Sequence, residues 1–337
     1  MNQKTLLTPH SSLLTKKNNL LAFSAGIDSS ALFFLLLESK IPFDIALVNY
    51  GTREQSSEEE AYALALAKQY GLKAYTVQAP QWESHFESSA RKFRYDFFES
   101  LIDKHHYENL ITAHQLNDQL EWFLMRLTKG AGVSELIGLE PVSPRKTAKG
   151  NTYSLVRPLL DSTKEELLEY LQKNNHTYFV DESNSDTAFE RNYFRKTFSD
   201  PLLAKYRQGI KRSFAYLRQE KKMLQSGIEV LFEQDELRVY RLDNPSLRAK
   251  AADLALKELG YLPSASQRSE IEAKESIVIG GKWAVVFQNH RLYIAPFLTT
   301  KMPKPFKELC RVSNLPIKIR PYCYEKGIRP AEVMALV

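Results

Sequence analysis

The sequence predicts an α/β protein whose amino-terminal half is built around a parallel sheet. Short apolar runs alternate there with longer stretches of helical character, and this alternation is typical of a parallel sheet with helices on both faces. The first apolar run, Leu20–Phe23, ends in a turn of small residues, Ser24–Ser29, that opens a helix. Ligands of such sheets gather beyond the carboxyl ends of the strands, so this turn is the first candidate for a functional site.

The elements follow in a regular order. The apolar runs predict four strands, at Leu20–Phe23, Phe43–Val48, Ala74–Val77 and Asn109–Ala113. The stretches between and after them predict helices over about 29–39, 55–70, 87–104 and 115–129. Residues 140–153 are rich in Pro, Lys and Gly and are predicted to be a flexible segment. A helix over about 163–174 comes next.

The composition of the 337-residue chain predicts an intracellular protein with an acidic partner. A formal net charge of +6 favours a partner such as RNA. The two cysteines, Cys310 and Cys323, form neither a disulfide framework nor a C-x-x-C metal motif. Ala31–Leu37, the longest apolar run, is far shorter than the ~20 residues of a membrane span, and the start of the chain lacks a signal-peptide pattern. We therefore expect a cytoplasmic protein with no membrane partner.

The turn Ser24–Ser29 has the properties of an anion site. Its small side chains let a phosphate approach the backbone, and the following helix start offers unpaired N–H groups. Asp28 would repel a bare phosphate, but it fits a divalent cation that bridges it to phosphates. The alternative is an ordinary turn in which Asp28 is only a favourable charge in the first turn of a helix.

Two further groups of charged residues have helical spacing. Asp118 and Glu121 lie three apart after a predicted strand and could hold Mg²⁺ or an ammonium group. Two arginine pairs also share a helical face and suit phosphate: Arg91 with Arg94, and Arg191 with Arg195. Solvated helix faces are the alternative for all three pairs.

Several motifs resemble one enzyme family. SAGIDSS, with Ala25 in place of the usual glycine, resembles the SGGxDS loop of the N-type ATP pyrophosphatases, the PP-loop superfamily. The stretch from His114 resembles the HxxDDQxET signature of tRNA(Ile)-lysidine synthetases, except that Asn117 replaces the first Asp and Trp122 the Thr. Further blocks follow in the family's order, namely VNYGTR near 48–53, RLTKGAG near 126–132, RPLL at 157–160, DESN at 181–184 and RNYFR at 191–195. The resemblance covers about residues 18–200.

The resemblance implies a reaction and a set of site residues. ATP is cleaved to AMP and pyrophosphate, and free L-lysine is joined to C2 of the wobble cytidine of tRNA(Ile) with a CAU anticodon, which changes codon reading from AUG to AUA. ATP is expected at Ser24, Ala25, Gly26, Ile27, Asp28 and Ser29, with Mg²⁺ held through Asp28. Asp28, Asp118 and Arg195 are the expected catalytic residues, and Asp118 with Glu121 the expected lysine site. Phosphate or tRNA contacts are expected from Arg91, Arg94, Arg191, Lys211 and Arg212.

The second half of the chain is predicted to consist of smaller parts. Residues 1–200 would form the catalytic domain, 201–240 a basic helical linker with its helix over 201–225, and 241–300 a small α+β domain. Residues 301–337 are a short basic segment that resembles a reduced second carboxyl-terminal domain of the family. The linker helix could follow an RNA backbone or serve only as a structural helix. A homodimer is compatible with the sequence.

Two other functions compete with this interpretation. One is another PP-loop enzyme, such as a tRNA thiolase or an amidating synthetase, but the cysteine content disfavours a thiolase. The other is a non-catalytic RNA-binding protein with an ATPase-like fold, against which the intact Asp28 and Asp118 argue. Lysine-dependent release of AMP in the presence of tRNA separates the three.

Overall fold

The computed structural model describes residues 6–51, 55–82, 86–180 and 190–334, and these form two compact units. The boundary between the units falls after Leu217, inside a long helix. The DESN stretch at 181–184 lies outside the described residues.

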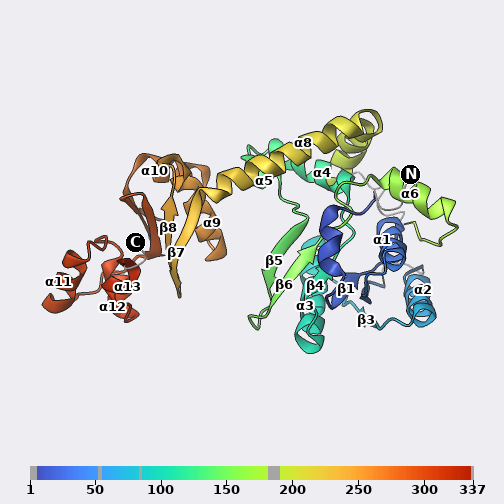
Figure 1. Cartoon of the computed structure of the whole chain (residues 1–337), viewed down its shortest axis with the longest axis horizontal. Coiled ribbons are helices and arrows are strands. Elements are labelled where there is room, and N and C mark those ends of the chain that lie inside the picture. Colours follow the sequence, from blue (N-terminus) through green and yellow to red (C-terminus); the bar gives the residue numbers. More distant parts are fainter. Residues whose placement is uncertain (1–5, 52–54, 83–85, 181–189, 335–337) are drawn as a thin grey trace. The chain divides into compact units, whose positions relative to one another are not determined.

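The first unit contains the predicted parallel sheet (Figure 1). Its strands run in the order β3-β2-β1-β4-β6-β5, and every neighbouring pair is parallel except β5 with β6. The strands are β1 (Asn19–Ala22), β2 (Asp44–Asn49), β3 (Ala74–Gln78), β4 (Asn109–Ile111), β5 (Val142–Lys146) and β6 (Thr152–Val156). The four predicted strands are thus present within one or two residues of their expected bounds.

Helices cover both faces of this sheet. Successive residues of a strand point to opposite faces, so Leu20 packs toward α3 while Leu21 packs toward α1, α2 and α6 (Figure 1). The helices of the unit are η2 (Pro9–Leu14), α1 (Ile27–Glu38), α2 (Gln55–Tyr70), α3 (Phe86–His105), α4 (Leu116–Leu127), α5 (Val133–Leu136), α6 (Lys164–Lys173), α7 (Glu190–Phe194), the π-helical η4 (Arg195–Ser199) and α8 (Asp200–Ser226).

The flexible segment predicted at 140–153 is a hairpin. Strands β5 and β6 pair antiparallel there, with Pro144 opposite Ser154. Proline is tolerated because β5 is the edge of the sheet, where its missing N–H removes no ladder bond from an inner strand. The prediction was wrong because the proline and the surface charges hide the alternation of a short edge strand.

The second unit is an antiparallel sheet with helices on both faces. Its strands, in the order β7-β8-β11-β10-β9, are β7 (Ile228–Gln234), β8 (Leu237–Leu242), β9 (Ser276–Ile279), β10 (Trp283–Gln288) and β11 (Arg291–Pro296). Its helices are η5 (Pro245–Leu247), α9 (Arg248–Glu258), α10 (Ala265–Ala273), α11 (Lys304–Val312), α12 (Arg320–Glu325) and α13 (Pro330–Met334). Strands β7 and β8 therefore begin within the residues expected to form the linker.

The carboxyl-terminal segment is folded against this sheet. Helices α9 and α10 pack on one face through residues such as Leu256, and α11, α12 and α13 pack on the other through residues such as Tyr322. Both cysteines are buried on the second face. No helix among the described residues is long and apolar enough to cross a bilayer.

Candidate functional site

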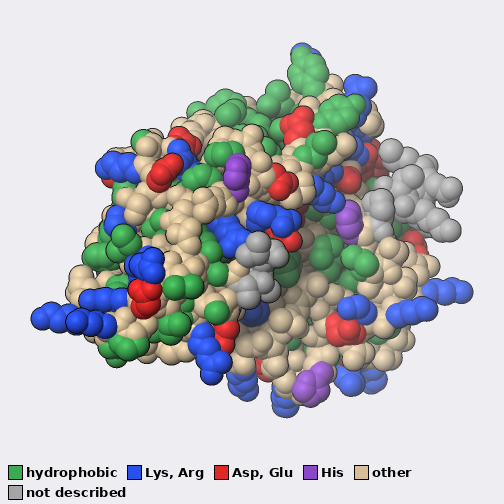
Figure 2. Space-filling view, turned by 60° about the vertical axis from the view of Figure 1, so that its left-hand side comes forward, with side chains coloured by type: hydrophobic (Ala, Val, Ile, Leu, Met, Phe, Trp, Pro, Cys, Tyr) green, Lys and Arg blue, Asp and Glu red, His purple; other side chains and the backbone are tan. Residues whose placement is uncertain are grey.

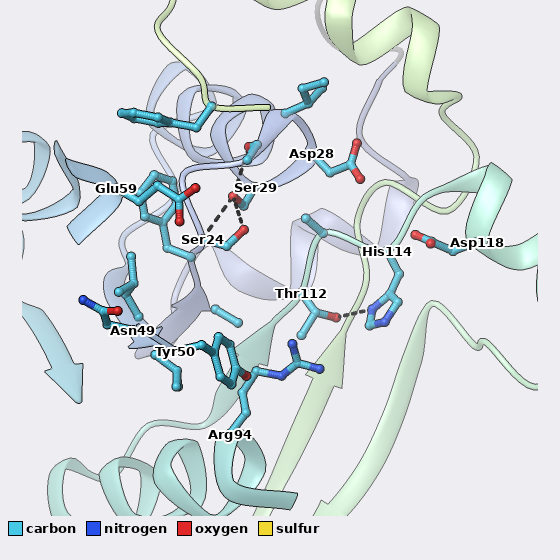
Figure 3. Close-up of a pocket in the computed structure, with 18 of the residues that line it drawn as sticks. Ser24, Asp28, Ser29, Asn49, Tyr50, Glu59, Arg94, Thr112, His114 and Asp118 are labelled. Atoms are coloured by element: carbon cyan, nitrogen blue, oxygen red, sulfur yellow. Dashed lines mark hydrogen bonds between the residues drawn. The ribbon is translucent and has the colours of Figure 1, made fainter. Parts of the chain in front are cut away.

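A cavity of about 470 Å³ opens where three parallel strands end (Figure 3). Its walls include residues after β1 (Ser24 and Gly26–Ser29), at the end of β2 (Asn49 and Tyr50) and after β4 (Thr112–His114). This is the carboxyl-terminal edge of the sheet. Strands β2 and β4 lie on opposite sides of β1, so the strand order reverses at β1. Ligands of such sheets commonly bind at the point of reversal. The volume is in the range of small-molecule sites.

The turn after β1 is held by its own hydroxyl groups. Ser29 Oγ accepts the backbone N–H of Ser24 at 3.2 Å and donates to Gly26 O at 3.1 Å, and Ser30 Oγ donates to Ala25 O at 3.1 Å. Ala25 has φ +56° and is fully buried, so it lies beneath the turn and outside the cavity wall. The glycine usual at this position in the resembling motif would adopt that φ without the strain that alanine bears.

Among the described residues, no side chain caps the amino-terminal end of helix α1. The starts of α4 and α6, which also reach the cavity, are closed by capping boxes, Gln115 with Asp118 and Thr163 with Glu166. The N-cap of α1 is Gly26, which has no side chain to accept the first N–H groups. Such a helix start, with the positive end of the helix dipole, is suited to bind an anion.

Two carboxyl groups face one another across this cavity. Asp28 points from the first turn of α1 toward Asp118 at the start of α4 (Figure 3). Burial, and then the charge of Asp118, raise the pKa of Asp28 to about 7. One oxygen of Asp28, Oδ1, is buried with no hydrogen-bond partner in the described structure. Ionised Asp28 would therefore be stabilised by a cation brought by a ligand.

Two arginines neutralise the second carboxyl group. Arg191 and Arg195 donate to Asp118 Oδ1 at 2.9 and 3.2 Å, and each also donates through Nε to Glu121. Burial opposes ionisation of Asp118, but His114 and then the two guanidinium groups outweigh burial and lower the pKa of this carboxyl group. Glu121 is only 2% exposed and is not part of the cavity wall, whereas Asp118 and both arginines are.

His114 supplies a neutral group beside these charges. Its Nδ1 lies 2.9 Å from Thr112 Oγ1, and burial lowers the pKa of the ring to about 4. The imidazole is therefore uncharged at pH 7, and it joins Asp118 at the same wall of the cavity (Figure 3).

The structure separates the other predicted contacts into two groups. Arg94 reaches the cavity beside Tyr50 (Figure 3), whereas Arg91 is exposed, lies outside the cavity wall and stacks on Tyr95 at 5.0 Å. Lys211 is not a free cation, because its Nζ lies 3.0 Å from the buried carboxylate of Glu166. Arg212 is exposed on α8.

Lys164 is a cavity residue that the sequence prediction missed. It is the first residue of α6, directly after the capping residue Thr163, and it lines the cavity near enough to Asp28 to oppose the rise of that pKa. The sequence did contain a signal for it. The S/T-x-x-E pattern after RPLL predicts that a helix starts at this point, and Lys164 is the first residue of that helix.

The departures from the family motifs have local structural roles. Asn117 lies outside the cavity wall, donating to Asp200 Oδ1 at 2.8 Å and accepting the N–H of Lys164 at 3.2 Å, two contacts that a carboxylate could not make together. Trp122 donates to Glu135 O at 2.9 Å and fills the space over Gly138. Asn49 donates to Glu60 and accepts the N–H of Gly51.

The donor set fits a magnesium ion that is completed by a nucleotide. In the described part of the chain, no group of three or more His, Cys, Asp or Glu is arranged so that it could hold a metal ion by itself. The unpartnered Oδ1 of Asp28, on a side chain that faces a second carboxyl group across the cavity, is suited to a hard cation. Mg²⁺ commonly takes one or two carboxylates and the phosphates of its substrate.

The fold and this site define a PP-loop ATP pyrophosphatase domain. Residues 2–202 match the family model described as "PP-loop domain". Among solved structures, the U34-tRNA thiolase NcsA of Methanococcus maripaludis, with its [4Fe-4S] cluster, is similar at a TM-score of 0.52 and 16% identity, over 64% of this chain and 76% of that one. This likeness shows the fold alone.

Curated relatives identify the family more narrowly. The chain is 43% identical to a tRNA(Ile)-lysidine synthase of Campylobacter jejuni strain RM1221 over 94% of its own length and 95% of the relative. The figures are the same for one of Wolinella succinogenes, and a Helicobacter pylori relative is 40% identical over 97% and 94%. The chain belongs to the tRNA(Ile)-lysidine synthase family.

Proposed function

We propose that this protein joins free lysine to C2 of the wobble cytidine in tRNA(Ile) with a CAU anticodon. As a member of the tRNA(Ile)-lysidine synthase family it is an ATP-dependent ligase that forms a carbon–nitrogen bond and modifies tRNA. The observation that carries the proposal at atomic level is the pair Asp28 and Asp118, which face one another beside the open start of α1.

The first step activates the base. O2 of the cytidine attacks the α-phosphorus of ATP, an O–P bond forms, and the bond to pyrophosphate breaks. The first turn of α1, which no described side chain caps, lines the cavity where its amides could hold phosphate oxygens, and Lys164 adds a positive charge on the same wall. Mg²⁺ held by Asp28 would supply further positive charge against the leaving pyrophosphate.

The second step transfers lysine. The ε-amine attacks C2 of the adenylylated cytidine, and AMP leaves with the O2 atom. The ammonium group of lysine must lose a proton before it attacks, and Asp118 is the carboxylate that the cavity offers to orient it. The neutral His114 lies beside it and adds no positive charge that would repel the ammonium group at pH 7.

Arg191 and Arg195 are proposed to link the two steps. Each uses Nε and one terminal nitrogen for Asp118 and Glu121, which leaves the other terminal nitrogen for a phosphate oxygen. In this arrangement Glu121 positions the arginines from behind. The sequence predicted that Glu121 contacts the lysine substrate directly. Such a contact would require Arg191 and Arg195 to release the Glu121 carboxylate.

Binding of tRNA is proposed to involve α8 and the carboxyl-terminal unit. Lys and Arg side chains are spread over the face shown in Figure 2, mixed with acidic and hydrophobic ones, rather than gathered in one patch. Arg212 is an exposed basic residue of α8. A cytoplasmic location and a homodimer remain proposals of the same account.

The test is incorporation of labelled lysine. Protein, ATP, Mg²⁺ and labelled lysine are incubated with total tRNA and, separately, with a tRNA(Ile) transcript whose wobble cytidine is replaced by uridine. Label in one tRNA species, and none in the uridine transcript, is expected. Label without that cytidine would contradict the proposal, and so would AMP release without any label in tRNA.

A further inference from the structure

Three aromatic rings form an exposed cluster on the helix that carries the two site arginines. Tyr193, Phe194 and Phe198 contact one another, with ring centroids 5.5 to 6.1 Å apart. The outer two are unusually exposed for such large side chains, Tyr193 at 47% and Phe198 at 40%. We call these three residues the aromatic cluster.

The cluster is created by the π-helical turn. Residues five apart in an α-helix point in different directions, but the i→i+5 bonding of η4 widens the turn. Tyr193 and Phe198 thereby come onto one face, with their rings 5.9 Å apart at an angle of 85°. π-Helical turns are frequent at functional sites, and this one presents two of its rings outward instead of filling a core.

The cluster adjoins the proposed reaction site. Tyr193 lies between Arg191 and Arg195 in the chain, and both arginines line the cavity. Along the helix axis the residues of the cluster are therefore within about one turn, a rise of about 5.4 Å, of the two arginines, although their rings do not line the cavity. The exposed Lys196 follows on the same segment and adds positive charge.

The proposed chemistry requires the reacting base to leave its stack. O2 and C2 of the wobble cytidine must reach ATP inside the cavity, and a base can do so only when it is extruded from its neighbours. Its neighbours in the anticodon loop then lose a stacking partner. Proteins that read single-stranded RNA loops place aromatic rings against such bases.

We infer that the aromatic cluster is a stacking platform for the unpaired anticodon-loop bases beside the wobble cytidine. The inference rests on the proposed function, because it takes the cytidine to react in the cavity beside Arg191 and Arg195. The aromatic cluster would bind RNA by stacking on its bases, whereas the basic residues would bind RNA through its phosphate charges. The rings position the substrate and take no part in bond formation.

The test compares variants that lose the rings with variants that keep them. The double variant Tyr193→Ala with Phe198→Ala removes the platform, and Tyr193→Phe with Phe198→Tyr preserves it. Leu64→Ala, which trims an apolar side chain that is 45% exposed on α2, is the control for loss of surface apolar area. Each protein is titrated with a tRNA(Ile) transcript carrying 2-aminopurine at the nucleotide after the wobble cytidine.

The wild-type protein and the double variant Tyr193→Phe with Phe198→Tyr should quench 2-aminopurine fluorescence, because stacking on a ring quenches the fluorescence of this base. The double alanine variant should lose the quenching and bind tRNA about 5- to 150-fold more weakly, as expected for one stacked base. Its affinity for ATP and the salt dependence of its tRNA binding should not change, because no charge is removed. Leu64→Ala should behave as wild type.

Equal tRNA affinity and quenching in the double alanine variant would overturn the inference. A change in sedimentation without a change in tRNA binding would also overturn it, and would assign the cluster to contacts between protein chains. If the alanine variant does not fold, the double variant Tyr193→Leu with Phe198→Leu keeps apolar area without the two exposed rings, and it should still lose quenching. The proposed function fails separately, if the wild-type protein transfers no lysine to the unlabelled transcript.

Discussion

Arg195 lies with its Nε 2.9 Å from Oε2 of Glu121, an acid that is almost fully buried. The two residues are 74 positions apart in the chain, and their contact fastens η4 to α4. Arg191 makes the equivalent contact from α7. Arg191 and Arg195 line the cavity, and the Glu121 carboxylate that orients them lies outside the cavity wall.

Replacing that carboxylate should slow both steps together. Glu121→Gln keeps the shape but removes the charge, so the guanidinium groups lose orientation and about 1–3 kcal/mol of interaction. Formation of adenylylated tRNA and transfer of lysine should each fall by about 5- to 150-fold. A quench-flow assay measures both steps. A variant that adenylylates normally but needs much more lysine would instead make Glu121 a lysine ligand.

Asp28→Asn should abolish adenylylation while stabilising the metal-free protein. The raised pKa of Asp28, at about 7, shows that its ionised form is disfavoured by burial and by Asp118. Its charge therefore lowers stability as the pH rises from about 4 toward 7, which is the reverse of a carboxylate held in an ion pair. Thermal unfolding in EDTA at pH 7.5 should show a gain of about 1–2 kcal/mol. Near-normal turnover in this variant would remove Asp28 from the site.

Gly26→Ala should fold normally and lose ATP. Gly26 has φ −72°, and an added Cβ would meet only Ser24 Oγ, at an ordinary 3.5 Å. The fold itself does not need glycine there, so stability should change by less than about 1 kcal/mol. A phosphate held at the first amides of α1 would meet the new methyl group, and ATP affinity should fall at least about tenfold. Ala25→Gly, directly beside it but beneath the turn, is the matched control and should keep ATP affinity. Unchanged ATP affinity in Gly26→Ala would place the phosphates elsewhere.

Arg212 and Lys211 should respond differently to charge reversal, although they are neighbours. Arg212→Glu should weaken tRNA binding and reduce the slope of log K against log salt by about 1, the value expected when one phosphate is no longer neutralised. Lys211→Glu should destabilise the fold by about 3 kcal/mol or more, because it faces the buried Glu166. Salt-dependent binding and urea unfolding measure the two effects. Equal effects of both variants on tRNA binding alone would contradict this assignment.

Sequence reasoning found the turn that lines the cavity because the elements that define this turn are local. A strand, a turn of small residues and a helix start define Ser24–Ser29, and the i, i+4 spacing of Arg191 and Arg195 correctly placed them on one face. Their partners could not be read in this way. The contacts of Arg195 with Glu121, and of Lys211 with Glu166, join segments whose proximity depends on tertiary packing.

The misplaced residues have the same explanation. Arg91 and Arg94 share a helical face by spacing, yet only Arg94 reaches the cavity, because α3 turns Arg91 onto Tyr95 at the surface. The sequence motif suggested that Asn117 replaces a carboxylate of the site. In the structure its side chain instead hydrogen-bonds Lys164 of α6 and Asp200 of α8. The contacts of a polar side chain depend on its burial and its neighbours, which spacing along one helix does not specify.

The two half-reactions offer the most direct test of the account. The protein is incubated with tRNA(Ile) transcript and ATP labelled at the α-phosphate, without lysine, and is then given lysine. Label should first enter the tRNA and then leave it as AMP, with one lysine gained at the wobble cytidine for each AMP released. Release of labelled AMP without the label ever joining the tRNA, or an amount of AMP independent of lysine, would contradict a single cavity that activates the base and then couples it to lysine.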